Sequence, residues 1–570
     1  MHAAIWSKPL IDQLRRWIEG PSSDRWAFGL SSTSPTSPGE IYVSTQMPQD
    51  VFDDLYSAVY AILDDAKMDR DLLKLYKGSH GATDPHSHVL EFGRFFYQQR
   101  RGLLGWVVDK VGRCSPDVLD EFDALHRPRV SIRAVFDMLA SVSRRDGESD
   151  QDFLHYLAHR RHSLGAYRGG SSGYDDEARA FAAACFQHSG LQVTPDEVLV
   201  CCGGAKGVFL AFAAALMCTR VFDDLHHGGG QLLAPDGYYQ SLRLIPAIFG
   251  GDIAVAPQLT GPVVREWLAD SQGQQGRAIY VPLVNNLDGR VLDRDRALGI
   301  AQVVLTHNQD HPGDPVYVLA DDVYAGSYLG DVDPQPIGAV TGVDLGDHSL
   351  GRMSDWTVSV VTPSKTVALP TSRVAFATST SARLRQAVAH YRTVFSHGRV
   401  PQIDELTAVA ALCLTPQSWV DGWNLRYRRT VLGLERDVAA LNAEIGWEAY
   451  RLEVPQGGWY MPLQMSHRLL PSQVTSSVDA FSVLLHYGGD RVDTGIGMLP
   501  GELFGYRSSN AFTLRGSFAV GDEVLAELVP RLRDMATILT GPDATAVVDQ
   551  ALTRARKVAP VDAILRHCRY

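Results

Sequence analysis

The sequence has little cysteine, and its cysteines are not spaced as metal ligands or as disulfide partners. The 570 residues contain seven cysteines, an odd number, which lie at Cys114, Cys185, Cys201, Cys202, Cys218, Cys413 and Cys568. Their spacing matches neither a disulfide framework nor a zinc-binding motif and is typical of a reducing compartment. We therefore predict a cytoplasmic protein without a metal site.

The sequence also lacks an excess of positive charge and any long hydrophobic run. Its formal net charge is -12, which argues against nucleic-acid binding because neutralising phosphates requires a basic surface. The longest apolar run, residues 207–218, is too short to cross a bilayer, and the first 20 residues show no secretory signal. We predict neither a nucleic-acid nor a membrane partner, which leaves small molecules and other proteins.

The first 150 residues are predicted to form a helical N-terminal extension. Residues 51–77 place apolar side chains at helical spacing, and residues 88–111 and 131–145 repeat the pattern. Residues 31–39, SSTSPTSPG, are predicted to be a loop or linker by their composition.

From about residue 190, short apolar runs alternate with helical segments. Seven such runs occur, at residues 196–202, 230–235, 252–258, 278–284, 316–321, 356–362 and 373–378. Strands that are buried on both faces have this composition, and their alternation with helices predicts an α/β fold with a mainly parallel sheet. Ligands of such sheets bind at the carboxyl ends of the strands.

After residue 400 the pattern is that of a smaller α+β domain. Helical patterns over 404–414 and 424–447 precede strand-like segments over 450–465 and 510–520. We therefore predict four units: a helical extension (1–150), a large α/β domain (151–395), a small C-terminal α+β domain (396–545) and a C-terminal tail (546–570).

Several residues that follow the predicted strands are candidates for a binding site. The Gly203–Gly204 turn opens a helix, as a phosphate site would, although such turns are as often simple tight connections. Tyr238 and Tyr239 follow the next strand, where a tyrosine pair is more often packing than a platform for a cofactor.

Polar residues follow the next two strands as well. Asn286 and Gly289 come after the strand at 278–284. Asp321 ends a buried strand, where an unpaired charge would be costly unless it meets a cation or a protonated ring nitrogen, and Asp322 and Tyr324 follow it.

Lys365 follows the strand at 356–362, within TPSKTVALPTSR. Most lysines are solvated surface charges, but a lysine held at the end of a buried strand is also the setting of a Schiff-base amine. The neighbouring candidates favour the second interpretation.

Taken in order, these residues resemble the fold-type I pyridoxal-phosphate enzymes, specifically the class I/II aminotransferase family. The shared order is Gly-Gly-Ala at 203–205, an aromatic residue at 239, Asn-x-x-Gly at 286–289, Asp-x-x-Tyr at 321–324, Ser-Lys at 364–365, arginine at 373 and LRGSF at 514–518. The resemblance covers roughly residues 155–540, and its motifs are specific by their order rather than singly. It implies a seven-stranded sheet and pyridoxal 5'-phosphate as cofactor.

The resemblance assigns roles around the cofactor ring. Lys365 would anchor pyridoxal phosphate covalently, and Asp321 would pair with the protonated pyridine nitrogen. Tyr324 and Asn286 would hydrogen-bond the phenolic oxygen of the ring. Tyr239 would stack on the ring, with Tyr238 as its rival.

The resemblance also assigns the phosphate and substrate contacts. The phosphate would be held by backbone N–H groups and side chains of Gly204, Ala205, Lys206, Thr362, Ser364 and Arg373. Tyr167 resembles the tyrosine that reaches the phosphate of a neighbouring subunit, which implies a homodimer with composite active sites. Arg515 would bind the substrate α-carboxylate, with Asn286 and Tyr239 as further substrate contacts.

Three features depart from the family pattern. The usual Asn-Pro-Thr-Gly is Asn-Leu-Asp-Gly at 286–289, so the loop loses its proline and gains a charge. Lys206 stands where a neutral residue is common. The short N-terminal arm that touches the substrate in the family has no evident counterpart in the first 150 residues.

We predict an aminotransferase that acts on an amino acid through an external aldimine, with Lys365 removing the Cα proton. The alternative is an atypical lyase or a carbon–carbon bond-forming or cyclising enzyme of specialised metabolism. It is favoured by the long extension and by GYYQSL at 237–242, which is similar to the Tyr-Tyr segment of aminocyclopropane-carboxylate synthases, whose substrate is S-adenosylmethionine.

The sequence disfavours two further interpretations. An aminotransferase-like transcription regulator is disfavoured because the first 100 residues show no basic recognition helix. Asp84, His86 and His88 have the spacing of metal ligands, but a polar loop is the more common meaning of such a segment.

Overall fold

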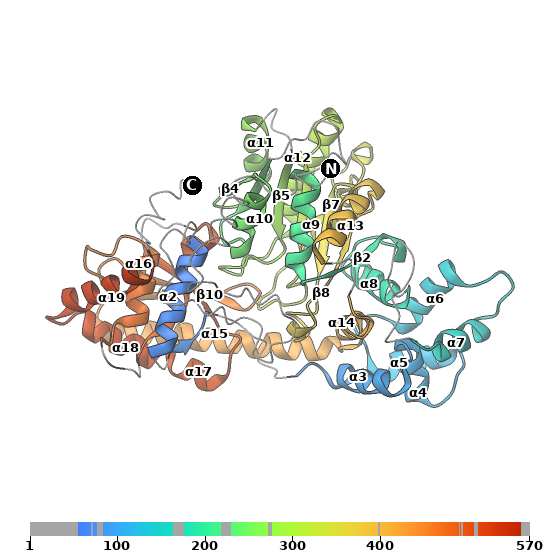
Figure 1. Cartoon of the computed structure of the whole chain (residues 1–570), viewed down its shortest axis with the longest axis horizontal. Coiled ribbons are helices and arrows are strands. Elements are labelled where there is room, and N and C mark those ends of the chain that lie inside the picture. The colour runs from blue at the N-terminus through green and yellow to red at the C-terminus, as the bar shows by residue number, and fades with distance from the viewer. Residues whose placement is uncertain are drawn as a thin grey trace, which may run out of the picture.

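A seven-stranded sheet forms the centre of the molecule (Figure 1). The structure is a computed structural model and describes residues 55–69, 72–76, 84–162, 176–217, 230–271, 276–396, 400–489, 491, 494–506 and 511–559. The strands are β2 (Val198–Cys202), β3 (Gln231–Pro235), β4 (Asp252–Ala256), β5 (Arg277–Pro282), β6 (Tyr317–Asp321), β7 (Thr357–Val361) and β8 (Val374–Thr378).

The strand order is β2-β8-β7-β6-β5-β3-β4, with β8 antiparallel to both neighbours and the other pairs parallel. The predicted mainly parallel sheet is confirmed, and each of its seven strands lies within one of the predicted apolar runs or within one residue of it.

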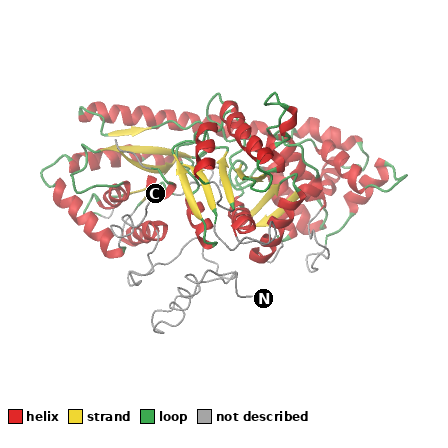
Figure 2. Ribbon diagram, turned by 90° about the horizontal axis from the view of Figure 1, so that it is seen from above, coloured by secondary structure: helices red, strands yellow, loops and turns green. Residues whose placement is uncertain are grey.

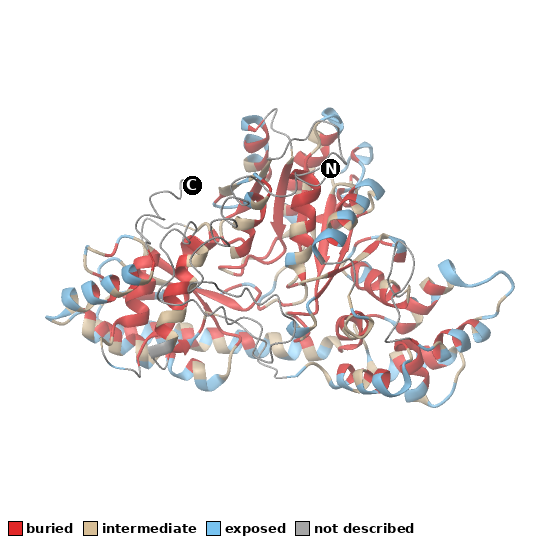
Figure 3. Cartoon of the chain, viewed as in Figure 1, coloured by how far each residue is buried: buried red, intermediate tan, exposed pale blue. Residues whose placement is uncertain are grey.

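Helices cover both faces of this sheet, which is why its strands are apolar almost throughout. On one face lie α9 (Ala205–Met217), α10 (Leu244–Ile248) and α13 (Ala382–Ser396), and on the other α11 (Gly261–Asp270) and α12 (Arg294–Asp310). Figure 3 shows the sheet as the most continuously buried part of the molecule. Residues beyond the carboxyl ends of these strands are therefore held by a rigid layer.

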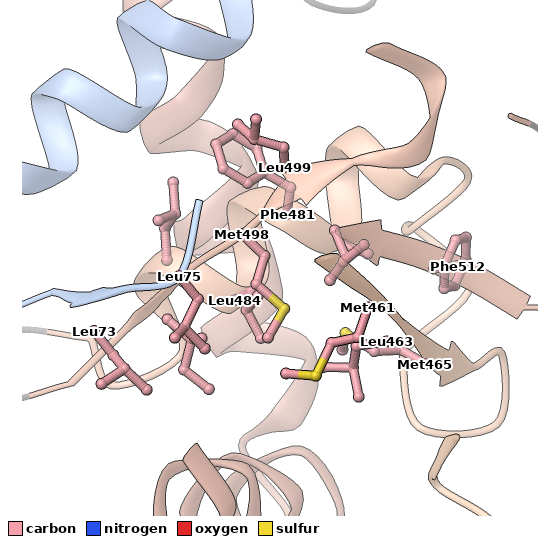
Figure 4. Close-up of a cluster of buried hydrophobic side chains, with 14 of the residues drawn as sticks. Leu73, Leu75, Met461, Leu463, Met465, Phe481, Leu484, Met498, Leu499 and Phe512 are labelled. Carbon is pink, nitrogen blue, oxygen red and sulfur yellow. The ribbon is translucent and has the colours of Figure 1, made fainter. Parts of the chain in front are cut away.

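The described segments 55–69 and 72–76 pack into the C-terminal region. Helix α2 (Leu55–Asp69) contacts α16 (Ser477–His486) and α19 (Ala544–Val558), and strand β1 (Leu73–Lys74) pairs in parallel with β11 (Ile496–Gly497). Figure 4 shows Leu73 and Leu75 beside Met498 and Leu484 in one buried cluster.

The helix predicted over residues 51–77 is therefore wrong at its C-terminal end. Leu73 and Leu75 donate backbone hydrogen bonds to Gly495 and Gly497, at 3.2 and 2.9 Å. This tertiary pairing outweighs the local helical pattern, since propensity is only a weak local preference.

A helical lobe is formed by residues 84–162. Its helices are α3 (Ser87–Gln99), α4 (Leu103–Val111), α5 (Asp117–His126), α6 (Ile132–Ser143) and α7 (Asp150–His159). They share a buried cluster with α8 (Asp176–His188) and α14 (Gln402–Leu414), at the β2 end of the sheet (Figure 1).

The single helical pattern predicted over residues 88–111 is in fact two helices. The break follows from Arg100, whose φ of 56° is left-handed and ends α3. The Arg100 carbonyl then accepts a hydrogen bond from the His162 N–H at 2.7 Å, which ties the break to the end of α7.

The C-terminal region combines a second sheet with helices, as predicted. The four strands lie in the order β12 (Leu499–Pro500), β13 (Ala511–Ser517), β10 (Tyr460–Ser466), β9 (Tyr450–Leu452). Helix α15 (Gln417–Ile445) runs along the molecule from the helical lobe to this sheet, as Figures 1 and 2 show. Helices α17 (Asp522–Ala526), α18 (Leu528–Leu539) and α19 complete the region.

The limits of the four predicted units remain a prediction. Within the described ranges, no helix is long and apolar enough to cross a membrane, and no cluster of three His, Cys, Asp or Glu could hold a metal ion. The five cysteines that the structure describes are free thiols.

Candidate active site

The candidate residues gather along one edge of the large sheet, where the carboxyl ends of β3, β5, β6, β7 and β2 meet the start of β8. In strand order this edge carries Tyr239 after β3, Asn286 after β5, Asp321 at the end of β6, Lys365 after β7, Arg373 before β8 and Gly204 after β2. Residues far apart in the chain therefore become neighbours in the order of the strands.

Lys365 faces three aromatic side chains, one from the segment after β6 and two from the start of β10. Its Nζ lies 4.7 Å from the ring centroid of Trp459, 5.7 Å from that of Tyr324 and 5.8 Å from that of Tyr460. An amine held against aromatic faces is partly desolvated while its charge is still accommodated. The position suits an amine that forms and breaks a covalent bond.

Asp321 is buried at the end of β6 and is held by two donors. Tyr280 Oη donates a hydrogen bond to its Oδ2 at 2.5 Å, and the Val323 N–H donates to its Oδ1 at 3.3 Å. Burial raises the pKa of Asp321 to about 6, with these two hydrogen bonds and the Lys365 charge opposing the shift. A cationic ligand atom beside this carboxylate would offset the cost of its burial.

Tyr324 is a buried neutral phenol in the same site. Burial, followed by the influence of Tyr460, holds its pKa well above the usual range, and the positive charge of Arg515 opposes this. Tyr324 therefore remains an O–H donor at neutral pH.

Arg515, on β13, is a buried cation with unsatisfied hydrogen-bonding capacity. Only 2% of it is exposed, and its guanidinium lies between two rings, with Cζ 3.7 Å from the centroid of Tyr460 and 4.3 Å from that of Phe504. Its Nη1 donates to Asn286 Oδ1 at 2.5 Å, and its Nε has no hydrogen-bond partner among the described residues. Nor does it form an ion pair with any carboxylate of the described chain.

An unpaired buried cation is costly unless an anion joins it. The site around Arg515 therefore matches a carboxylate, which can accept two hydrogen bonds from a guanidinium.

The other end of the site has donors suited to a phosphate. Gly203 and Gly204 adopt φ values of +88° and +66° before α9, and a Cβ on Gly204 would lie 3.2 Å from Arg373 Nη2. The first N–H groups of α9, at Ala205 and Lys206, have no partner within their helix, and the helix dipole favours an anion there. The Thr362 and Ser364 hydroxyls lie 2.7 Å apart on the adjoining loop.

These donors, together with Asp321, fit the two ends of pyridoxal phosphate. Asp321 would meet the protonated ring nitrogen, Lys365 would bond to the aldehyde carbon, and the glycine turn with Arg373 would face the phosphate.

Four of the candidate residues differ in what they can offer a ligand. The Gly204 N–H donates to the Arg373 carbonyl at 2.8 Å, so it shapes the turn and is not available to a phosphate in this arrangement. Lys206 is exposed. Tyr238 is fully buried with its ring against Gly505, whereas Tyr239 is partly exposed and packs edge-on against Phe209, which leaves Tyr239 as the aromatic available to a cofactor.

The unusual Asn-Leu-Asp-Gly loop is held by an ion triad. Arg290 pairs with Asp236 at 2.6 Å and with Asp288 at 2.5 Å, which ties the loop after β5 to the loop after β3. Gly289 has a φ of +67°, and a Cβ there would lie 2.4 Å from the Gly457 carbonyl of the small sheet's turn. The charge gained at Asp288 thus helps to hold Asn286 in place.

Some residues of the site were not found from the sequence. Tyr280 was assigned to a strand only, and Trp459 and Tyr460 were assigned to a strand-like segment, although the aromatic pair directly after Gly457–Gly458 was a usable signal. The Tyr76 carbonyl accepts a hydrogen bond from Arg515 Nη2 at 3.4 Å, so the N-terminal segment does reach the site. Tyr167 lies outside the described residues.

Comparison with known proteins places these features in a family. The family model described as aminotransferase class I and II matches residues 157–467. No curated protein sequence matches the chain.

Solved structures of low sequence identity share the fold. The aspartate aminotransferase of Thermus thermophilus with maleate has 18% identity and a TM-score of 0.55, covering 84% of this chain and 96% of that one. The aromatic aminotransferase of Pyrococcus horikoshii has 17% identity and a TM-score of 0.56, with coverage of 84% and 98%. The aspartate aminotransferase of Thermotoga maritima has 16% identity and a TM-score of 0.54, with coverage of 87% and 97%.

Proposed function

Because the chain belongs to the class I and II aminotransferase family, and is thus a pyridoxal-phosphate-dependent transferase, we propose that it transfers the amino group of an α-amino acid to a 2-oxo acid. The observation that carries the proposal is the buried Arg515, which has no carboxylate partner in the described chain. It donates to Asn286, which follows β5 at the sheet edge that also carries Lys365 and Asp321. An α-carboxylate is the anion that this arrangement accommodates.

The residues of the chain divide the work of this reaction. Pyridoxal phosphate, when bound, supplies an electron sink for the negative charge that develops at the substrate Cα. Asp321, held by Tyr280, would keep the ring nitrogen protonated. Arg515 and Asn286 would orient the α-carboxylate so that the Cα proton faces Lys365, whose Nζ would take that proton as general base.

The remaining contacts follow from the same proposal. Ala205, Lys206, Thr362, Ser364 and Arg373 would hold the phosphate, while Gly204 shapes their turn. Tyr239 would stack on the ring, and Tyr324 would donate to its phenolic oxygen together with Asn286. A homodimer in which Tyr167 completes the partner's site is part of the proposal.

The alternative of a lyase or cyclising enzyme acting on S-adenosylmethionine has no specific support, since the structures compared above are of aminotransferases. The regulator has none either. If no amino donor yields its 2-oxo acid while the cofactor is bound, the aminotransferase proposal is wrong and the lyase becomes the better candidate.

The cofactor anchor is tested by absorbance. After incubation with pyridoxal phosphate and dialysis, the parent protein should keep a visible absorption band, and Lys365→Ala should lose both the band and amino transfer. Lys557→Ala, an exposed lysine on α19, should keep both and serves as the matched control. A band that persists in Lys365→Ala would contradict the proposal.

The carboxylate site is tested separately. Arg515→Leu should keep the visible band but weaken the binding of amino acids by more than about tenfold, because a hydrogen-bonded ion pair to the substrate is lost. Unchanged binding of every amino acid tried would remove Arg515 from the substrate site.

A further inference from the structure

Tyr280 lies on β5 and reaches the carboxylate at the end of the neighbouring strand. The register pairs Tyr280 with Leu319 of β6. Because side chains alternate along a strand, Leu319 and Asp321 lie on the same face of the sheet, and Tyr280 shares that face. Its phenol extends towards the carboxyl end of the sheet, where Oη donates a hydrogen bond to Asp321 Oδ2 at 2.5 Å. The pairing of two central strands therefore aims this donor at Asp321.

Packing holds the Tyr280 ring in place. Tyr280 is fully buried. Phe209 of α9 packs edge-on against its ring at a centroid distance of 5.9 Å and against the Tyr239 ring at 6.3 Å. Tyr239 is the aromatic available to a cofactor, so one side chain of α9 supports both residues. The hydrogen bond from Tyr280 to Asp321 is thus a fixed part of the site and is shielded from water.

The two hydrogen-bonded groups are in the states that this bond requires. Burial, followed by the nearby Asp321, holds the pKa of Tyr280 well above its usual range, so the phenol remains an O–H donor at neutral pH. Among the influences that oppose the raised pKa of Asp321, the Tyr280 hydrogen bond is the largest, ahead of the Val323 N–H and the Lys365 charge. Tyr280 is therefore the group that contributes most to keeping Asp321 ionised.

A carboxylate beside a pyridine nitrogen shares one proton with it. The proton lies either on the nitrogen, which gives a charged pair, or on a carboxylate oxygen, which gives a neutral pair, and burial by itself favours the neutral pair. A hydrogen bond donated to the carboxylate stabilises its ionised form and so favours the charged pair. The group that donates to Asp321 therefore decides where the proton lies.

We propose that Tyr280 is a positioning residue that places this shared proton on the ring nitrogen of pyridoxal phosphate, by donating to Asp321 and keeping it ionised. Without the phenol, the N–H bond of the ring would break and an O–H bond would form at Asp321, which leaves both groups neutral. A protonated ring withdraws electrons more strongly from the substrate Cα, so Tyr280 acts on the reaction through Asp321. The inference rests on the proposed function, because it takes Asp321 as the partner of the ring nitrogen.

Nitrogen NMR of the loaded protein tests where the proton lies. Pyridoxal phosphate labelled with ¹⁵N in the ring is bound to the parent protein, to Tyr280→Phe and to Asp321→Asn, and the ¹⁵N chemical shift reports the protonation of the ring nitrogen. We expect a protonated nitrogen in the parent. Tyr280→Phe should shift towards the unprotonated value, which Asp321→Asn should define because it lacks the carboxylate. A parent-like shift in Tyr280→Phe, or an unprotonated nitrogen in the parent, would overturn the inference.

Two further variants separate the lost hydrogen bond from a loss of packing. Tyr450→Phe removes a buried O–H group that donates to the Leu532 carbonyl at 2.9 Å in the C-terminal region, and it should keep the parent shift. Tyr280→Leu deletes the same donor as Tyr280→Phe with a smaller side chain, and gives the same measurement if Tyr280→Phe does not fold. Equal shifts in Tyr450→Phe and Tyr280→Phe would mean that a general loosening of the fold moves the proton.

Cofactor affinity gives a second measurement that needs no turnover. Deazapyridoxal phosphate carries a CH group in place of the ring nitrogen and so cannot share a proton with Asp321. The parent protein should bind pyridoxal phosphate more than about tenfold more tightly than this analogue, because the analogue cannot form the charged hydrogen bond. Tyr280→Phe should reduce the preference by at least about threefold, since a neutral hydrogen bond replaces the charged one. An undiminished preference in Tyr280→Phe would count against the inference.

The visible absorption band separates the two levels of the proposal. If the band forms and depends on Lys365 but the ¹⁵N shift is the same with and without Tyr280, the role of Tyr280 is wrong and the proposed function stands. If the band forms and Tyr280 moves the shift but no amino donor reacts, the proposed function fails and the role of Tyr280 stands. If the band does not form, both fail.

Discussion

At the scale of single residues, Asp322 is a buried carboxyl without a cation beside it. Burial, followed by the nearby Asp321, raises its pKa to about 8. In the described chain it has no ion-pair partner, and only its backbone groups are hydrogen-bonded, the N–H to the Val360 carbonyl at 3.0 Å. The folded protein therefore holds a proton here that the unfolded chain releases near its ordinary pKa of 3.8.

The sign of the pH dependence follows from this raised pKa. The folded state binds more protons than the unfolded state between about pH 4 and pH 8, so stability is lost as the pH rises through that window. We expect Asp322→Asn to raise the free energy of unfolding at pH 8 by more than about 1 kcal/mol and to leave it nearly unchanged at pH 3.5. Urea unfolding of the cofactor-free protein at both pH values measures this, and an equal effect at both would rule out the titration.

At the scale of helices and loops, the residue that ends α3, Arg100, has a strained backbone conformation. Arg100 adopts a φ of 56°, in the left-handed region that costs a non-glycine residue roughly 1–2 kcal/mol. We expect Arg100→Gly to raise the free energy of unfolding by about 1 kcal/mol because glycine adopts this conformation without that cost. Arg94→Gly, an exposed position inside the same helix, should instead lower it by about 1 kcal/mol. Both variants replace an arginine with glycine, so changes of opposite sign in the free energy of unfolding, measured by urea titration, would isolate the backbone effect. Changes of the same sign would refute it.

The ion triad of the Asn-Leu-Asp-Gly loop is a second element with a measurable role. Burial raises the pKa of Asp236 to about 6, and Arg290 opposes that shift. Removing the arginine would leave Asp236 and Asp288 facing each other with side chains only 14% and 12% exposed.

We expect Arg290→Met to lower the free energy of unfolding by about 2 kcal/mol, because two partly buried carboxylates lose their shared partner. Arg352→Met breaks the exposed ion pair with Asp355 and should change the free energy of unfolding by less than about 0.5 kcal/mol. Thermal unfolding at pH 7 compares them. A loss in Arg290→Met no larger than in the control would mean that the triad does not stabilise the loop.

At the scale of the whole molecule, three histidines lie where the helical lobe meets the rest of the chain. The rings of His86 and His88 are 4.5 Å apart, and those of His88 and His126 are 4.9 Å apart. His88 Nδ1 lies 3.3 Å from the Leu414 carbonyl at the end of α14, and His86 packs against Trp419 of α15. The pair Asp84 and His86 lies in a loop, as the sequence predicted, whereas His88 is buried within α3.

Burial lowers the pKa of His86 to about 4, with the positive charge of His88 adding to the effect and Glu91 opposing it. The unfolded chain takes up this proton near pH 6.5, so stability is lost as the pH falls from about 6.5 towards 4. Between pH 7 and pH 4.5 we expect the free energy of unfolding of His86→Gln to fall by about 1 kcal/mol less than that of the parent protein. This figure allows for the partial solvent exposure of His86. His348→Gln, at an exposed site, should follow the parent. The measurement is the free energy of unfolding of all three proteins as a function of pH. If the three curves are parallel, the histidine cluster is not the acid-sensitive contact.

Local patterns in the chain predicted the large sheet and the places of the candidate residues after its strands. The seven strands of the large sheet were predictable because strands buried on both faces are apolar throughout, and Asp321 and Lys365 were identified by their places after such strands. The order of these motifs was enough to indicate the family. Each strand and each motif is short and local, whereas the family is indicated only by the order of the motifs along the chain.

Contacts between distant segments were not predictable in this way. Strand β1 has two residues and forms only because Gly495 and Gly497 accept its hydrogen bonds. The contact of Arg515 with Tyr76 likewise joins residues that are far apart in the chain.

The sequence by itself determined the sheet, the proposed cofactor residues and the family, because these depend on local hydrophobic pattern and on the order of short motifs. Only the tertiary structure decided that residues 72–76 lie beside Arg515, that Tyr238 is fully buried whereas Tyr239 is partly exposed, and that an ion triad holds the loop of Asn286. These features depend on which surfaces are buried against each other. That choice is made by the free energy of the whole fold, and no local pattern in the sequence records it.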